Sequence, residues 1–195
     1  MKKFKLLLTL TILLVITACG TTDTAEEIDT NRGFDMWEYM TSPLDYEVEY
    51  DVYENDVKTD YYIETNKVFD NGDTYERRSA TDRTTLFLNS SYILMKEPAR
   101  DVEINRYVHL GDNHIFKSSD IDNCRVERFY PKYTVHDSTF DNVLMIDCLS
   151  KSGVKQELYY GYSEGIVAIY QNDNSVINEY IKVKEKRIFK KNIIN

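Results

Sequence analysis

The stretch YEVEYDVYENDVKTDYYIET, residues 46–65, decides the fold class, because its side chains alternate between two kinds. Tyrosine and valine at positions 46, 48, 50 and 52 are separated by the acidic Glu47, Glu49 and Asp51. A period of two is typical of an antiparallel strand with one face buried and the other in water. Residues 54–56 predict a turn. The return strand continues with Thr59, Tyr61, Ile63 and Thr65.

The rest of the chain repeats this short-strand pattern. Asp70-Asn71-Gly72-Asp73 predicts a hairpin turn, since asparagine and glycine tolerate positive φ. Further strands are predicted over residues 74–80, 84–89, 92–96, 102–110, 156–162, 166–170 and 176–189. Phe34–Met40 predicts one short N-terminal helix in which Phe34, Trp37 and Met40 share a side. We therefore expect an all-β antiparallel meander that forms a curled sheet, half-barrel or sandwich.

The first residues predict export. Three lysines precede an apolar run from Leu6 to Ile16, which is the pattern of a signal peptide and is too short to span a bilayer. Ile16-Thr17-Ala18-Cys19 then resembles a bacterial lipobox. The resemblance implies cleavage before Cys19 and acylation of that residue, with palmitate among the expected chains. An ordinary secretory signal is the alternative.

These features divide the chain into three expected parts. Residues 1–18 are the signal peptide, residues 19–33 the lipidated cysteine and a flexible tether, and residues 34–195 a single β-rich domain. We expect the chain to be attached to the membrane through the lipid on Cys19. With Gly20 after the cysteine, similarity to known sorting favours the outer membrane, facing the periplasm, in a two-membrane cell. In a one-membrane cell, the expected place is the outer face of the plasma membrane.

Charge and composition exclude one class of partner. Without the signal peptide, the formal charge falls from −9 to −12, so nucleic acid, which needs a basic face, is not an expected ligand. The basic stretch from Lys182 to Asn195 is expected to be a solvated strand end rather than a lipid-binding patch. The sixteen tyrosines suit a β-protein with tyrosine on its surface or, alternatively, an exposed aromatic binding face.

The two remaining cysteines predict a disulfide. Cys124 and Cys148 are equidistant from His136, so a hairpin centred there places them opposite each other. Disulfides persist in the compartments outside the cytoplasm. The competing interpretation, a catalytic thiol, needs a histidine base nearby, and His136 is expected at the far end of the hairpin.

Two features could indicate catalysis, namely a serine motif and the many carboxylates, but neither predicts an enzyme. Gly161-Tyr162-Ser163-Glu164-Gly165 matches the nucleophile elbow of hydrolases. However, a β-branched run follows Ser163 where the elbow needs a helix, and all three histidines precede it. A hydrolase that uses Ser163 is therefore only the second alternative, and we predict no catalytic residue. A glycosidase-like carboxylate pair stays open, since nothing selects two of the many acids.

No metal or cofactor is expected. His109 and His114 flank Asp112 at a spacing that fits no zinc pattern. The turn at Asp70 and Asp73 lacks the closing glutamate of a calcium loop. The basic cluster Arg77, Arg78 and Arg83 is expected to pair with carboxylates across strands and to contribute little to stability.

Two resemblances accompany these patterns. The stretches WEYMTS, YEVEYDVYENDVKTDYYIET and ELYYGYSEGIVAIY resemble a group of small bacterial lipoproteins of unknown role. The length, the leading helix and the meander resemble the curled half-barrel of periplasmic lipid carriers. The first resemblance implies export and a β-fold and supplies no catalytic residue, and the second is an analogy of fold that carries no function.

The functional expectation is a membrane-anchored, non-catalytic lipoprotein with a structural or protein-binding role, and the alternative is a carrier of a lipid or other apolar ligand. A carrier predicts a concave apolar face beyond the needs of packing. A partner-binding protein predicts no cavity and an exposed aromatic patch.

Overall fold

A computed structural model describes residues 31–54, 57–69, 72–173, 176–182 and 187–188. Its strands are β1 Gly33–Asp35, β2 Tyr46–Glu54, β3 Val57–Val68, β4 Thr74–Arg78, β5 Arg83–Leu88, β6 Tyr92–Lys96, β7 Asp101–Asn105, β8 Tyr107–His109, β9 Phe116–Lys117, β10 Ile121–Val135, β11 Ser138–Ser150, β12 Lys155–Gly161, β13 Gly165–Asp173, β14 Val176–Lys182 and β15 Arg187–Ile188. One helix, α1 Met36–Met40, follows β1.

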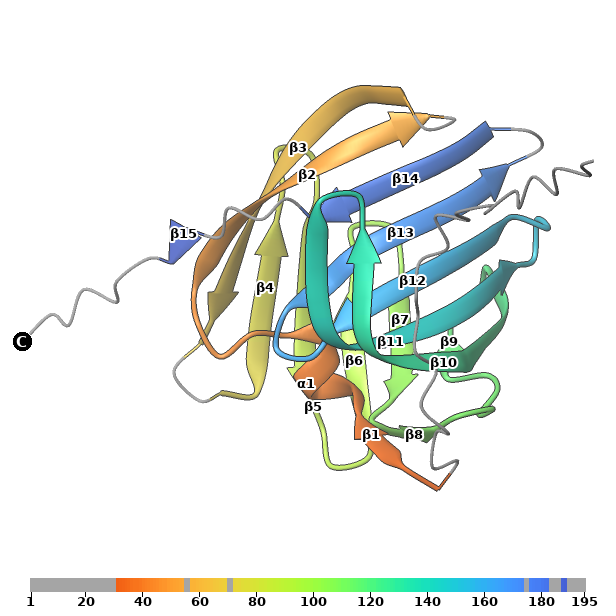
Figure 1. Cartoon of the computed structure of the whole chain (residues 1–195). Coiled ribbons are helices and arrows are strands. Elements are labelled where there is room, and N and C mark those ends of the chain that lie inside the picture. Colours follow the sequence, from red (N-terminus) through yellow and green to blue (C-terminus); the bar gives the residue numbers. More distant parts are fainter. Residues whose placement is uncertain (1–30, 55–56, 70–71, 174–175, 183–186, 189–195) are drawn as a thin grey trace, which may run out of the picture.

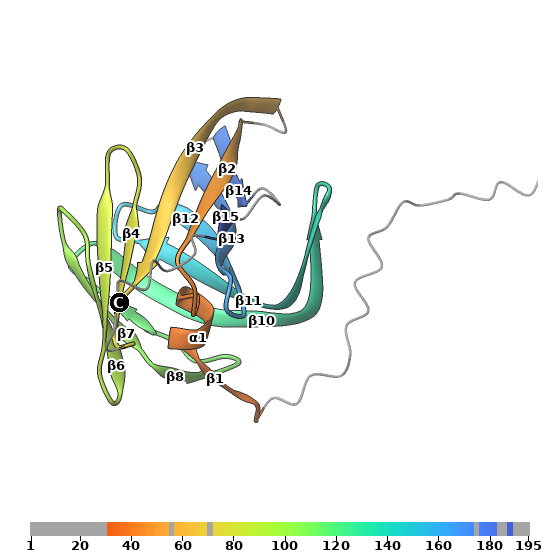
Figure 2. The same ribbon diagram turned by 90° about the vertical axis from the view of Figure 1, so that its left-hand side faces the viewer.

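Most of the strands form one large antiparallel sheet, which confirms the prediction of an all-β fold. Its order is β10-β11-β12-β13-β14-β2-β3-β4-β5-β6-β7-β9, with β15 also paired to β2, while β1 and β8 form a separate two-stranded sheet. The large sheet is strongly curled around α1 (Figures 1 and 2). Its two end strands, β9 and β10, do not pair with each other. The fold is therefore an open curled sheet rather than a two-layered sandwich.

The concave face of the sheet, which α1 covers, holds the main core. Side chains from β4–β7 meet side chains from β10–β12 there, and Met36, Tyr39 and Met40 of α1 pack between them. Leu144, Ile146 and Cys148 point to this face, whereas Val143 and Met145 point to the opposite one. β11 therefore has apolar residues on both of its faces.

The predicted helix is shorter than expected and begins two residues later. Phe34 lies in β1, paired with Val108 of β8, because the Asp35 side chain ends the strand and caps the helix. An Asp35 carboxylate oxygen accepts a hydrogen bond from Trp37 N at 3.0 Å. The buried side of the helix is Met36, Tyr39 and Met40, and Trp37 is only partly buried.

Replacing Asp35 is expected to destabilise this end of the core. Its carboxylate also pairs with Arg106 at 2.8 Å. Asp35→Ala removes both the cap and the ion pair and is expected to lower the free energy of unfolding by about 1 to 2 kcal/mol in a urea titration. Asp35→Asn keeps a capping oxygen and should lose less than half of that. Equal losses in the two variants would contradict the capping role.

A bulge decides which residues of β3 face inward. Glu54 pairs with Val57, but a register shift between Val52 and Tyr53 moves the pairing by one residue, so that Tyr50 lies opposite Tyr62. A shift of one residue exchanges the faces of a strand. Tyr61 and Ile63 belong to the return strand, as predicted, and they lie on its outer face, 57% and 43% exposed.

Other predicted strands differ at their ends. The expected strand over 102–110 is two strands, β7 and β8, and the expected strand over 176–189 is β14 and β15. β10 runs on through Pro131 to Val135, which is possible because β10 pairs with β11 alone among the described strands and proline is tolerated at an edge. Gly33, which was expected in the tether, belongs to β1.

The β10–β11 hairpin bends so that its tip stands over the convex face (Figure 2). The His136 ring there stacks on Tyr53 of β2 with 4.5 Å between ring centroids. Beneath the tip, Tyr133 stacks on Tyr159 at 4.6 Å, and the hydroxyls of Tyr133 and Tyr170 are 3.2 Å apart. Tyrosines thus build a second small core on the convex face, and most of the described tyrosines are packed rather than spread over the surface.

Candidate ligand cavity on the concave face

The sheet splits next to β3, and the split opens a cavity. β3 pairs with β4 only from Thr65 to Val68, so the stretch from Val57 to Glu64 has no strand beside it on that side within the described residues. The turn from Ser79 to Asp82, between β4 and β5, faces this free edge, and β3 and β4 diverge visibly (Figure 1). The space between them is a cavity of about 850 Å³, which we call the edge cavity.

The edge cavity has apolar walls and acidic groups. Val52, Tyr62 and Ile169 line its inner part, and Tyr61 and Ile63 line its outer part. Its charged side chains are Asp60, Glu64 and Asp82, with no basic side chain among the residues that line it. Among these acids, only Glu64 has a carboxylate oxygen that is buried without a hydrogen-bond partner in the described chain.

A second cavity of about 200 Å³ lies on the same concave face, and we call it the inner cavity. Apolar side chains from β6, β9, β12 and β13 line it, namely Met95, Phe116, Leu158, Tyr160, Ile166 and Ile169. The disulfide of Cys124 and Cys148 forms part of its wall. Ile169 lines both cavities, so the two adjoin at β13.

Charged side chains mark the rim of the inner cavity. The Arg100 guanidinium donates to a Glu97 carboxylate at 2.6 Å and bridges to Asp120, which belongs to the segment before β10. A hydrogen bond from Ser118 is the largest cause that lowers the pKa of Asp120, and Arg100 lowers it further. The bridge therefore remains charged at neutral pH and links the turn between β6 and β7 to the segment before β10.

Arg77 enters the inner cavity from β4, which the sequence did not predict. Arg78 and Arg83 pair with Glu76 on the outer face, as cross-strand pairing predicts. Arg77 points to the concave face instead, because residues alternate across the sheet, and its guanidinium contacts the Met95 sulfur at 3.7 Å. The sequence does contain a sign of this orientation. Arg77 follows the buried Tyr75 by two residues, and side chains two positions apart in a strand lie on the same face.

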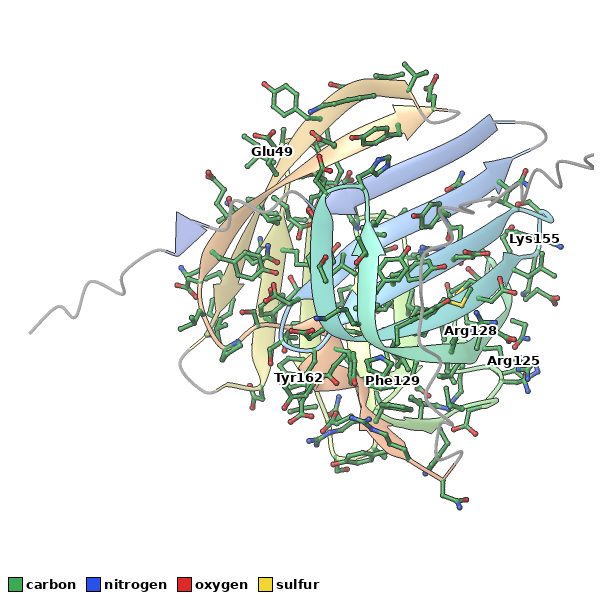
Figure 3. All side chains as sticks on the ribbon, in the orientation of Figure 1. Glu49, Arg125, Arg128, Phe129, Lys155 and Tyr162 are labelled. Carbon is green, nitrogen blue, oxygen red and sulfur yellow. A yellow bond between two sulfur atoms is a disulfide. The ribbon has the colours of Figure 1, made fainter. Side chains whose placement is uncertain are left out.

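The two cysteines are bonded as their spacing predicts. Cys124 and Cys148 are opposite each other, with their Cα atoms 4.1 Å apart. The hairpin turn is formed by His136 and Asp137, and a bulge between Val126 and Arg128 restores the alignment of the cysteines. The disulfide, near the start of β10 and the end of β11, is the yellow bond in Figure 3.

Ser163 lies in the hairpin turn between β12 and β13. Its backbone N–H donates to Glu38 O at 2.7 Å, and its φ is 56°. Gly165 has a φ of 75°, and a Cβ there would lie 3.4 Å from the Tyr46 hydroxyl, so the second glycine of the motif is explained by the turn and by close packing. A strand follows Ser163, as expected, where a nucleophile elbow has a helix.

The histidines and acids that the sequence analysis considered as metal ligands do not come together in one site among the described residues. His109 Nδ1 lies 3.6 Å from an Asp112 carboxylate oxygen, while the His114 backbone N–H bonds to Asn123. The described residues contain no group of three or more His, Cys, Asp or Glu side chains placed to bind a metal ion. Asp70 and Asn71, and the predicted lipidation site Cys19, lie outside the described residues.

The end of the molecule opposite the edge cavity is closed by aromatic contacts around α1. Phe34 stacks on Phe129 at 5.4 Å, and Tyr39 meets Tyr162 edge to face at 5.6 Å. The labelled side chains of Phe129 and Tyr162 lie at this end in Figure 3. In the described part of the chain, the five-residue α1 is the sole helix, and no helix is long and apolar enough to cross a membrane.

Comparisons with known proteins give no family. No family model matches the chain, and no curated protein matches it. One similar solved structure is the crystal structure of a LolA superfamily protein from Nitrosomonas europaea. It is 10% identical, the match covers 79% of this chain and 90% of that chain, and the TM-score is 0.29. A likeness at this TM-score carries no argument about the present chain.

Proposed function

We propose that the chain is a non-catalytic binding module that holds an amphiphilic molecule with an apolar chain on its concave face. The observation that carries this proposal is the pair of adjoining cavities, which leave space beside apolar side chains where a core needed only for packing would be filled. Concave, mostly apolar sites with a few polar groups are typical of ligand-binding sites. This function corresponds to the carrier alternative of the sequence analysis.

The proposal includes the expected place of action. An exported chain with lipidated Cys19 would present the cavities outside the cytoplasm, close to a membrane that contains amphiphiles. The disulfide supports export, because such bonds persist in oxidising compartments.

Filling the cavity tests the proposal. Ile169 lines both cavities, so Ile169→Trp is expected to weaken binding of the neutral probe 1-N-phenylnaphthylamine at least tenfold, followed by its fluorescence and by displacement with dodecanol. The matched control is Val57→Trp, which adds the same side chain at a position that is 64% exposed and lines neither cavity. Equal probe binding in the two variants, or none in the wild type, contradicts the proposal.

A second candidate function is the binding of a partner protein on the outer face of β3. Val57, Tyr61 and Ile63 are large apolar side chains that are 64%, 57% and 43% exposed on this one strand. A photo-crosslinking residue at position 61 should then give a defined adduct in cells, and the same residue at Tyr107, which is also 57% exposed, should not. Identical crosslinking at the two positions would speak against a specific partner.

A further inference from the structure

A group of unpaired polar atoms lies on the concave face where the two cavities adjoin. Glu64 and Asn66 of β3 and Arg77 of β4 share this face, and Asn66 is the cross-strand partner of Arg77. Glu64 precedes Asn66 by two residues in β3, at the diagonal position from which a long side chain still reaches Arg77. Glu64 lines the edge cavity and Arg77 the inner cavity. We call these three side chains the polar patch.

Each member of the polar patch has a buried atom without a hydrogen-bond partner in the described chain. These atoms are Glu64 Oε1, Asn66 Nδ2 and Arg77 Nε. The other side of the Asn66 amide is occupied, since its oxygen accepts from the Tyr75 hydroxyl at 2.8 Å. Arg77 reaches only the Met95 sulfur, which is a weak acceptor. A buried polar atom left unpaired costs about 1 to 3 kcal/mol, so three together in one place need an explanation.

The Arg77 guanidinium keeps its positive charge. Burial lowers the pKa of Arg77, but the neighbouring Glu64 carboxylate and several tyrosines raise it by more, and the pKa of the guanidinium ends above its ordinary value. No ion pair within 4 Å joins Glu64 and Arg77 among the described contacts. The Glu64 carboxyl and the Arg77 guanidinium therefore lie on the same face without a direct ion pair, with the Asn66 amide beside them.

We propose that the polar patch binds the head group of the amphiphile and that the preferred head is that of an N-acylated amino acid. Its carboxylate accepts a hydrogen bond from Arg77 Nε, and its amide N–H donates to Glu64 Oε1, since these two residues line the cavities. Its acyl chain lies along the apolar side chains of the inner cavity and continues past Ile169 into the edge cavity. This assignment rests on the proposed function and adds the class of ligand to it.

A head-group series tests the assignment on the full chain. The probes are N-dodecanoylglycine and dodecanol, compared by displacement of 1-N-phenylnaphthylamine. Wild type is expected to bind N-dodecanoylglycine at least tenfold more tightly than dodecanol, because hydrogen bonds to charged groups are strong in a dry site. Arg77→Met is expected to remove this preference and to retain dodecanol binding. Retained dodecanol binding shows that the cavity is intact in the variant.

Two further variants separate ligand recognition from a structural role. Arg78→Met removes the neighbouring arginine, which pairs with Glu76 on the outer face, and should leave the preference unchanged. Glu64→Gln should strengthen binding of plain dodecanoate severalfold, because it removes a carboxylate that repels the anionic head. A structural role of the patch would not produce this gain.

The outcomes distinguish the two proposals. If neither probe binds to wild type, the proposed function fails. If both bind and Arg77→Met keeps the wild-type preference, or if wild type shows no preference, the head-group assignment fails while the proposed function stands.

Discussion

The protein is expected to unfold cooperatively when the pH rises from 10 to 12. Burial raises the pKa of Tyr160 and of Tyr39 to about 12, and it raises the pKa of Tyr46, Tyr50 and Tyr75 as well. A raised pKa means that the folded chain keeps these phenols neutral while the unfolded chain ionises near pH 10. The stabilisation is complete below pH 10 and is lost as the pH rises through the folded-state values.

The expected size is large because several groups act together. A shift of two pKa units corresponds to about 3 kcal/mol for Tyr160 alone, and a typical domain has a stability of about 5 to 15 kcal/mol. Tyrosinate absorbance at 295 nm and β-sheet circular dichroism should therefore change together in one transition. Gradual ionisation without loss of the sheet signal would contradict the burial of these phenols.

A matched pair of variants sharpens the test. Tyr160→Phe removes one buried ionisable hydroxyl and is expected to move the alkaline midpoint upward. Tyr107→Phe removes a hydroxyl from a side chain that is 57% exposed and should leave the midpoint in place.

Loss of the disulfide is the second large expected effect. Cys124 and Cys148 are separated by 24 positions, and closing a loop of this length contributes about 3.5 kcal/mol in the chain-entropy model. The double variant Cys124→Ser/Cys148→Ser should therefore have a Tm about 10 °C lower in a calorimetric scan. The bond also lies in the wall of the inner cavity, so probe binding should weaken together with stability.

Reduction provides the control for this prediction. Treating the wild type with dithiothreitol should lower its Tm to that of the double variant and should not change the Tm of the variant itself. A double variant as stable as the oxidised wild type would show that the hairpin does not depend on the crosslink.

Residues 46–65 predict the strand pair but not which side chains of β3 point inward, because a bulge shifts the register by one residue. The alternation of Tyr46, Val48 and Tyr50 is confirmed, since all three are buried. The bulge next to Val52 then brings Glu64 inward and Ile63 outward. Strand propensity and turn residues do not encode a one-residue shift, because its stability comes from tertiary packing across the sheet.

The candidate site was harder to predict than the sheet. The disulfide could be predicted because a symmetric spacing about a hairpin is a local property. The edge cavity depends on where β3 and β4 stop pairing, which no single stretch of sequence reveals. The sequence places Arg77 and Arg78 side by side in one basic cluster, but the two lie on opposite faces of β4. The pairing of the whole sheet decides which face of β4 packs against the core, and therefore which of the two arginines is buried.

Native mass spectrometry of the full chain shows whether the concave face holds an amphiphile. The protein should retain a molecule of lipid mass that is lost on denaturation, whereas a covalent acyl group would survive denaturation. Ile169→Trp should carry much less of this mass, and Val57→Trp should carry as much as the wild type. A wild-type chain that is bare and that also takes up neither dodecanol nor N-dodecanoylglycine would contradict the claim.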